Sequence, residues 1–369
     1  MTTAPTNRDV ATWLDGTAAA AANPEARKLD AYPHLDWLRF VLASVVLLDH
    51  SGVHFPGPID GSLAVAAFLA LSGWLIGGIL LKSDRADLPR FFFNRSTRIW
   101  APYFTAILLL YGTAAAMRGI DGNWFKYLFY DVTFTHYTFT VFPRALTEMP
   151  LGGTGNHFWS ISVEEQFYLA APLLMIFTRW GKSVATWLVV AAVLTAMQSV
   201  FTPIALGVGA AALNGDRPII DTAGKRWLAA LAAALFFAVA WRWNVQPFRA
   251  LFAVSLVLAL TAPGRRDRLG VLAGGVSYPL YLHQWVGGFA VNLATKIVPL
   301  AIPGAVRIGV VYAASLSVAI VLWWLVDRNV MLHRNRFYTP ALGRTCAIIA
   351  YLLVAIGLAG GLTLHLLGY

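Results

Sequence analysis

Long apolar runs alternate with short polar segments along most of this chain. Eleven of these runs are long enough to cross a hydrocarbon core of about 30 Å, or nearly so. Their approximate bounds are 35–50, 62–81, 99–117, 158–177, 183–199, 202–213, 227–241, 248–262, 271–294, 305–326 and 345–367. Because the run at 202–213 is short, ten or twelve spans are alternatives. We therefore expect an all-α polytopic membrane protein, a bundle of about 10–11 transmembrane helices.

The composition agrees with a protein that has the bilayer as its solvent. The 369 residues are 58% hydrophobic and only 12% charged, whereas an average globular domain carries about 25% charged residues. Such a chain has too few polar side chains to cover a soluble surface. Its one cysteine, Cys346, excludes an internal disulfide framework.

The net charge of +10 is unevenly distributed between alternate connections of the spans. If the amino terminus is cytoplasmic, twenty of the 28 lysines and arginines lie on the inner side and seven on the outer side. Because cytoplasmic loops collect such residues, this orientation is favoured. Nucleic-acid binding would require a basic patch on a soluble fold. We expect no nucleic-acid partner and a multi-pass location in the cell (inner or plasma) membrane.

Three regions differ in their expected organisation. Residues 1–34 are Ala-rich, mixed in charge and without a signal-peptide pattern, so we expect a mobile cytoplasmic tail. Residues 35–328 form the expected transmembrane domain, and 329–369 form a cytoplasmic loop and an additional C-terminal helix. The outer connection 118–157 is long and rich in aromatics, which favours a folded cap at the headgroup level.

The first span carries two ionisable residues, Arg39 and His50. Eleven residues of α-helix turn through about 1100°, so both side chains lie on one stripe, about 16 Å apart along the axis. Ionisable groups within spans usually face the bundle interior and mark a pathway. The alternative is that Arg39 snorkels to lipid phosphates and His50 is an interfacial residue. Asp36 precedes Arg39 by three residues, a spacing that allows an ion pair.

A second cluster lies at the outer end of the fourth span, in "HFWSISVEEQFYLAAPLL". If this span enters from outside, His157, Glu164 and Glu165 lie at the level of His50. A histidine beside a carboxylate is a common arrangement for activating a hydroxyl. Adjacent helical residues point about 100° apart, so only one glutamate can face His50 well. The alternative is that both glutamates favour the positive end of the helix dipole.

Two further segments carry candidate ligand groups. Arg95 and Arg98 are three residues apart and share a face if their segment is helical, and guanidinium groups suit phosphate. Their alternative role is anchoring at the inner surface. In "GGVSYPLYLHQW", Tyr281 and His283 either line a cavity or pack between helices. No zinc or nucleotide-loop pattern is present, and we expect no metal.

Several of these segments together resemble the integral-membrane acyltransferase family 3, the acyl-CoA-dependent O-acyltransferases of cell-surface glycans and related acceptors. They occur in the expected order and read "LDWLRFVLASVVLLDH", "FLALSGWLIGGIL", "RFFFNRSTRIWAPYF", "HFWSISVEEQFYLAAPLL" and "VSYPLYLHQW". The family often has a Glu-Pro pair after its tenth span, where this chain has Asp327 and no proline. Many members carry a soluble outer hydrolase-like domain after an eleventh span. Because this chain stops at Tyr369, we expect a stand-alone membrane version here.

The resemblance implies roles for the residues singled out above. It implies that His50 is the catalytic base, that Arg39 binds or positions the donor, and that Arg95 and Arg98 belong to the cytoplasmic donor site. Glu164 and Glu165 match a segment thought important for catalysis, without a choice between them. Tyr281 and His283, from the matched late span, complete the expected donor-binding residues.

The expected activity follows from the resemblance. We expect a membrane O-acyltransferase that moves an acyl group, by default acetyl, from cytoplasmic acyl-CoA to a hydroxyl of an extracytoplasmic polysaccharide or glycan, such as an exopolysaccharide. Acyl-CoA serves as the co-substrate, and the lipid bilayer surrounds the chain. The alternatives are a small-molecule or lipid-linked sugar acceptor, a proton-coupled transporter or flippase, and a structural scaffold.

Overall fold

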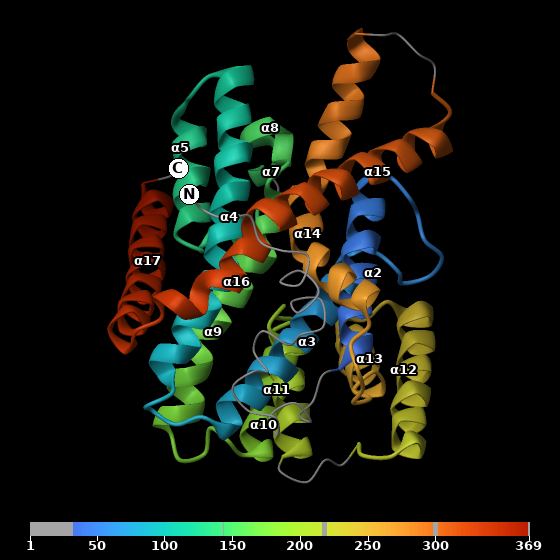
Figure 1. The fold of residues 1–369 in the computed structure, drawn as a ribbon, viewed down its shortest axis with the longest axis vertical. Coiled ribbons are helices and arrows are strands. Elements are labelled where there is room, and N and C mark those ends of the chain that lie inside the picture. The colour runs from blue at the N-terminus through green and yellow to red at the C-terminus, as the bar shows by residue number, and fades with distance from the viewer. Residues whose placement is uncertain (1–31, 143, 216–219, 298–301, 368–369) are drawn as a thin grey trace, which may run out of the picture.

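A computed structural model describes residues 32–142, 144–215, 220–297 and 302–367 of the chain. Within these ranges every regular element is a helix and there is no strand. Figure 1 shows the helices gathered around a central group that includes α3, α9 and α14. The predicted all-α fold is therefore confirmed, whereas the tail expected at 1–34 falls, up to residue 31, outside the described residues.

Each predicted span coincides with a helix of the structure. In chain order these are α2 (Pro33–His50), α3 (Gly61–Lys82), α4 (Leu88–Arg118), α9 (Trp159–Phe177), α10 (Val184–Ala196), α11 (Thr202–Asn214), α12 (Ala223–Trp243), α13 (Gln246–Ala259), α14 (Arg268–Ile297), α15 (Gly304–Leu322) and α17 (Pro340–Leu366). Five helical stretches among the described residues are long and apolar enough to cross a membrane, namely α3, α4, α12, the continuous run Gly304–Phe337 and α17. A multi-pass membrane protein is thus supported, and the expected 10–11 crossings and the orientation stay predictions.

Helix α4 begins eleven residues before the predicted third span, at Leu88 rather than 99. A proline in its first turn, Pro89, suits a helix start because its missing N–H would have no helical partner there. The arginine-rich segment that follows is too polar to be recognised from hydropathy. Arg95 and Arg98 therefore lie on one helix, at the spacing that places them on a common face.

The long connection 118–157 is folded, as predicted. It contains α5 (Gly122–Val132), α6 (His136–Phe139), α7 (Ala145–Glu148), α8 (Pro150–Gly153) and the 3₁₀ turn η2 (Asn156–Phe158). The buried carboxylate of Asp131 joins this cap to α4: it accepts from the hydroxyl of Tyr111 at 2.6 Å and contacts Nδ1 of His136 at 2.6 Å. Both carboxylate oxygens are thereby satisfied, as burial requires.

Helix α3 forms the centre of the bundle and packs on α2, α9, α11 and α13. Its closest approach is to α11, where a Cβ added to Gly73 would overlap the carbonyl oxygen of Ile204, and one at Gly207 would overlap that of Ala70. Small residues permit such contact between the backbones of membrane helices. In the most apolar stretch of α3, 72% of the residues are buried, against 11% in α12, whose apolar surface faces outward.

The segment after the tenth span is a helix rather than the expected loop. Helix α15 continues through one π-helical turn, η3 (Trp323–Asp327), into α16 (Arg328–Phe337), which packs on α4. No proline interrupts this stretch, so the helix can pass through Asp327. Arg90 of α4 donates to the side chain of Asn335 at 2.7 Å, which ties the two helices together.

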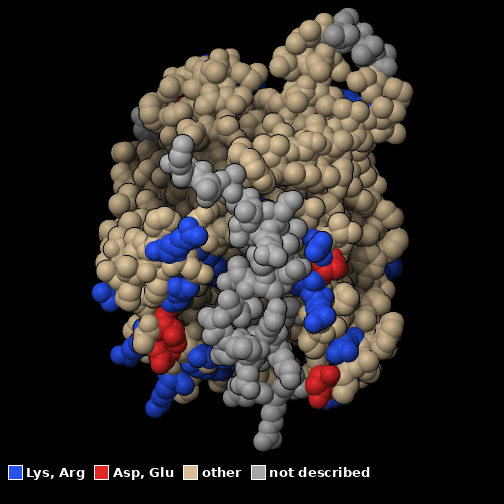
Figure 2. All heavy atoms as spheres, viewed as in Figure 1, with Lys and Arg blue, Asp and Glu red and all other residues tan. Residues whose placement is uncertain are grey.

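Contacts between connections agree with the predicted sidedness. Lys182 donates to the carbonyl oxygen of Ser83 at 2.7 Å, and both belong to segments assigned to the inner side. Arg90 and Asn335 likewise lie in inner segments. In Figure 2 the lysines and arginines of the face shown gather toward one end of the molecule. The chain therefore has one arginine-rich end, and which membrane face this end occupies stays a prediction.

Candidate active site

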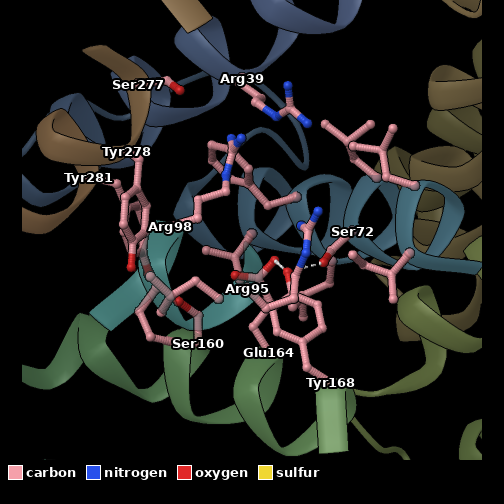
Figure 3. A pocket seen from close by; sticks show the side chains of 18 of the residues that line it. Arg39, Ser72, Arg95, Arg98, Ser160, Glu164, Tyr168, Ser277, Tyr278 and Tyr281 are labelled. Carbon is pink, nitrogen blue, oxygen red and sulfur yellow. Dashed lines mark hydrogen bonds between the residues drawn. The ribbon is translucent and has the colours of Figure 1, made fainter. Parts of the chain in front are cut away.

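A cavity of about 290 Å³ lies between α2, α3, α4, α9 and α14, beside the connection that precedes α14. Its wall from α3 is largely apolar. Its polar lining consists of Arg39, Arg95, Arg98, Arg266, Glu164, Ser72, Ser160, Ser277, Tyr168, Tyr278 and Tyr281. Figure 3 shows the three arginines of α2 and α4 reaching into this space from its walls. The predicted donor residues Arg39, Arg95, Arg98 and Tyr281 thus come together.

Positive charge dominates the cavity lining. Four guanidinium groups face it, against the single carboxylate of Glu164. A second carboxylate, Asp36, accepts from Arg39 at 3.3 Å and forms an ion pair with Arg266, whose Nε lies 2.8 Å from its Oδ2. The predicted pair between Asp36 and Arg39 is therefore confirmed. A cleft with low-dielectric walls and an excess of one charge attracts the opposite charge, and planar guanidinium groups match phosphate oxygens.

Arg95 is held by an aromatic ring at the wall of the cavity. Its guanidinium carbon lies 5.9 Å from the ring centroid of Tyr168. Its Nε is buried and has no hydrogen-bond partner among the described residues. Because a buried donor without a partner costs free energy, this N–H is suited to a ligand that supplies an acceptor. Arg95 is therefore both placed in the cavity and incompletely satisfied by the protein.

The predicted base, His50, is the last residue of α2 and is exposed. Its Nδ1 lies 3.0 Å from Oε1 of Gln284 on α14. His50 is not among the residues that line the arginine cavity, which ends on this side near Ser160 and Tyr281. The helical stripe that joins Arg39 to His50 therefore runs from the cavity toward the far end of α2.

The two glutamates do not pair with His50, contrary to expectation. Glu164 lines the arginine cavity, and Glu165 accepts from Nε1 of Trp100 at 3.0 Å. The reason is depth, because seven or eight helical residues place these carboxylates about 10–12 Å further along the axis than His157. Of this cluster, His157 lies on the side of His50, because its Nε2 is 3.1 Å from the carbonyl oxygen of Leu282, two residues before Gln284. The catalytic assignment of Glu164 and Glu165 therefore stays a prediction without a contact to His50.

The two candidates from α14 have separate surroundings. Tyr281 lines the cavity, donates to the carbonyl oxygen of His157 at 2.8 Å and contacts the hydroxyl of Ser160 at 2.6 Å. His283 is buried, with 1% of its surface exposed, and does not line the cavity. Two helical residues differ by about 200° in direction, so both cannot face one cavity. His283 therefore does not share the cavity with Tyr281, and its donor-binding role stays a prediction without a place in this cavity.

Sequence reasoning missed several residues that the structure brings to the site. These are Gln284 beside His50 and Ser72, Tyr168, Arg266 and Tyr278 in the cavity. A signal existed for Tyr168, which follows Glu164 by one helical turn and donates to it at 2.7 Å. The sequence held no such signal for Arg266, which cannot be told apart from the other lysines and arginines of the inner connections.

Comparison with known proteins adds family membership to this geometry. Residues 32–324 match the family model described as an acyltransferase domain. The peptidoglycan O-acetyltransferase OatA of Listeria monocytogenes is 28% identical over 171 residues, which cover 41% of this chain and 25% of the relative. A putative O-acetyltransferase of Staphylococcus aureus strain COL is 28% identical over 171 residues, with 41% and 26% covered.

A relative from another kind of bacterium matches a similar region. Nodulation protein 10 of Rhizobium leguminosarum bv. viciae is 28% identical over 180 residues, which cover 43% of this chain and 48% of the relative. The chain thus spans between a quarter and a half of the length of these relatives, and no solved structure matches it. Because the family model spans well over half of the chain, the protein belongs to this acyltransferase family.

Proposed function

We propose that this protein is a membrane O-acyltransferase that takes an acyl group, by default acetyl, from acyl-CoA and transfers it to a hydroxyl of an extracytoplasmic glycan. The observation that carries the proposal is the arginine cavity, in which Arg39, Arg95, Arg98 and Arg266 face an apolar wall. Coenzyme A combines phosphates with a long, weakly polar arm that ends in the thioester. The lining thus offers a complement to both parts of the donor.

The arginines of the cavity have different roles in the proposed donor complex. Arg95, with its unpartnered Nε, and Arg98 on the same face of α4 bind phosphate oxygens of coenzyme A. The arm then follows α2 past Arg39 toward His50, a distance of about 16 Å along the helix. The phosphates enter from the arginine-rich end of the molecule, which is the cytoplasmic end if the charge bias of the connections sets the orientation.

Transfer needs a base for the acceptor hydroxyl, and His50 is the candidate outside the cavity. Its imidazole removes the hydroxyl proton while the oxygen attacks the thioester carbonyl. A carbon–oxygen bond forms, the carbon–sulfur bond breaks, and the proton passes from the imidazolium to the departing coenzyme A thiolate. The products are the ester and free coenzyme A, and the base returns to its starting form.

The acceptor class rests on the relatives and on the exposure of His50. One relative is named as a peptidoglycan O-acetyltransferase, which favours a glycan over a soluble metabolite. His50 is exposed at the end of its helix, and a bulky acceptor can approach such a position. A lipid-linked sugar would reach the same place from the bilayer, so both kinds of acceptor belong in the assay.

Transfer by purified protein in proteoliposomes tests the proposal. The donor is radiolabelled acetyl-CoA, and the acceptors are peptidoglycan fragments, an exopolysaccharide and a lipid-linked sugar. Because general base catalysis contributes about 10²–10⁴-fold, His50→Ala should lose at least about a hundredfold in label transfer. His54→Ala is the matched control, because His54 is also exposed and lies four residues further on. Full transfer by His50→Ala would overturn the assignment of the base.

A further inference from the structure

The contact between His50 and Gln284 determines what the imidazole can do. Nδ1 of His50 lies 3.0 Å from Oε1 of Gln284, across 234 residues of chain. A neutral imidazole carries its proton on one ring nitrogen and a lone pair on the other. The partner of Nδ1 therefore decides which nitrogen is available as a base.

The second contact of Gln284 fixes the orientation of its amide. Its Nε2 donates to the carbonyl oxygen of Tyr281, one turn earlier on α14, at 3.1 Å. Only the NH₂ end of the amide can make that bond, because a carbonyl oxygen cannot donate. The oxygen must then face His50, and the hydrogen in that contact must belong to Nδ1.

The position of Gln284 is itself set by helix packing. The side chain is buried, and its backbone oxygen accepts from Oγ of Ser315 on α15 at 2.8 Å. A Cβ added to Gly287 would overlap Oγ of Ser315 and the carbonyl oxygen of Val311, so α14 and α15 touch at this level. Small residues at such contacts hold membrane helices in a close and fixed arrangement.

We infer that Gln284 is a positioning residue that holds His50 in the Nδ1–H tautomer and leaves Nε2 as the base. The inference rests on the proposed function of His50. During transfer Nε2 gains the acceptor proton and later loses it, while the Nδ1 proton stays with Gln284 throughout. The amide oxygen also accepts from the imidazolium, so it supports the charged intermediate without binding it as strongly as a carboxylate would.

The other titratable groups around His50 do not compete for this contact. Asp49 points toward α3, where a Cβ on Gly61 would come within 2.9 Å of its Oδ2. The ring nitrogens of His157 lie 3.2 Å from the carbonyl oxygen of Thr154 and 3.1 Å from that of Leu282. His283 is buried, with 1% of its surface exposed, and makes no hydrogen bond to His50. A neutral amide, rather than any of these groups, faces Nδ1.

Substitution of Gln284 by an acid and by an apolar residue tests the inference through the pH dependence of kcat/KM. In Gln284→Glu a carboxylate faces Nδ1 and stabilises the imidazolium. The acid limb should therefore move to higher pH by about one unit or more, the size of shift that a close opposite charge produces, with activity recovered at the alkaline side. Gln284→Leu frees the ring to adopt the other tautomer, which puts a proton on Nε2. Its kcat should fall about tenfold or more, a part of what general base catalysis contributes, with the KM for acetyl-CoA unchanged.

A matched control separates positioning from the loss of a buried amide. Gln246 is half-buried, and its Nε2 donates to the carbonyl oxygen of Ser199 at 3.1 Å. Gln246→Glu and Gln246→Leu should leave the acid limb unchanged. Binding of acetyl-CoA and the temperature of unfolding show whether each variant is folded.

The ¹⁵N chemical shifts of the His50 ring test the tautomer without any change at Gln284. Labelled wild-type protein should show a protonated Nδ1 and an unprotonated Nε2, with the signals assigned by their loss in His50→Gln. A protonated Nε2 in this spectrum would overturn the inference even if no Gln284 variant folds. Wild-type pH profiles for both Gln284 variants, with His50→Ala inactive, would also overturn it and leave the proposed function standing. Activity in His50→Ala would instead remove the proposed function itself.

Discussion

The hydroxyl of Tyr168 donates to the carboxylate of Glu164 at 2.7 Å, one helical turn away on α9. Because that proton is committed to Glu164, the contact between Tyr168 and Ser72 at 2.8 Å has Ser72 as its donor. The carboxylate is thereby fixed at the wall of the arginine cavity instead of pairing with Arg95, whose guanidinium lies over the same tyrosine ring. This arrangement keeps guanidinium charge available to a ligand.

Removal of the Tyr168 hydroxyl should weaken donor binding. In Tyr168→Phe the ring remains, but Glu164 loses its donor and can turn toward Arg95. We expect the KM for acetyl-CoA to rise about tenfold, which corresponds to ~1.4 kcal/mol, with kcat little changed. Tyr351→Phe is the control, because its hydroxyl donates to the carbonyl oxygen of Leu169 at 2.9 Å away from the cavity. An unchanged KM in Tyr168→Phe would show that this bond does not shape the donor site.

Loss of either arginine that we propose to bind phosphate should weaken the binding only of ligands that carry phosphate. Arg95→Gln and Arg98→Gln should each weaken coenzyme A binding about tenfold or more, since hydrogen bonds to charged groups contribute about 1.5–3 kcal/mol. Titration calorimetry with coenzyme A and with pantetheine, which lacks the nucleotide, separates the two parts of the donor. Pantetheine should bind the wild type and both variants alike.

Arg179→Gln provides the control for charge alone. Arg179 is exposed, stacks on Trp180 at 4.2 Å and does not line the cavity. Its substitution should leave coenzyme A binding unchanged. Equal losses in Arg179→Gln, Arg95→Gln and Arg98→Gln would point to a general surface charge effect instead of a phosphate site.

Asp36 links two arginines of the cavity, and its loss should destabilise the protein. Asp36→Asn leaves Arg39 and Arg266 without their shared carboxylate. We expect the free energy of unfolding to fall by about 2–3 kcal/mol, below the value for a fully buried pair because the Arg266 side chain is 50% exposed. Thermal unfolding in detergent micelles measures this. Asp221→Asn breaks an exposed pair with Lys225 and should change nothing, and an equally small effect in Asp36→Asn would contradict the expectation.

The cap carries a carboxylate whose contribution depends on pH. Glu148 accepts from Lys126 at 2.7 Å and from Tyr127 at 3.1 Å. The hydrogen bond from Lys126 holds the pKa of Glu148 below its usual value, so its stabilisation is present above that usual pKa and is lost as the pH falls through the lowered one. The unfolding temperature of the wild type should therefore fall more steeply over this acid range than that of Glu148→Gln. Parallel curves would show that the pair does not stabilise the cap.

Hydropathy predicted the long helices of this fold. The parts that it missed, the start of α4 and helix α16, have physical reasons. Each apolar run became a helix because a membrane chain must satisfy its backbone hydrogen bonds internally. The early start of α4 was missed because its first turns are rich in arginine. Helix α16 was missed because "RNVMLHRNRF" has no apolar run, and its stability comes from contacts with α4.

Contacts within one helix of the site could be predicted from the sequence, whereas contacts between helices that are distant in the sequence could not. The pairing of Asp36 with Arg39 follows from helical spacing, and the structure confirms it. The partner of His50 could not be found in the same way, because Gln284 lies 234 residues away and meets it only through tertiary packing. The two glutamates were assigned to the level of His50 from the start of their span alone, which ignored their depth along it. Helical position therefore identified candidates, and three-dimensional packing decided their partners.

Transfer across a sealed bilayer tests the central claim most directly. Proteoliposomes are prepared with the glycan acceptor sealed inside and radiolabelled acetyl-CoA added only outside, with empty liposomes as the leak control. Protein molecules whose arginine-rich end faces outward should label the enclosed acceptor and release coenzyme A outside. At low donor concentration Arg98→Gln should lower this labelling about tenfold or more, and His50→Ala should lower it at least about a hundredfold. Labelling that occurs only when donor and acceptor share one compartment would contradict a route from the arginine cavity to His50 across the membrane.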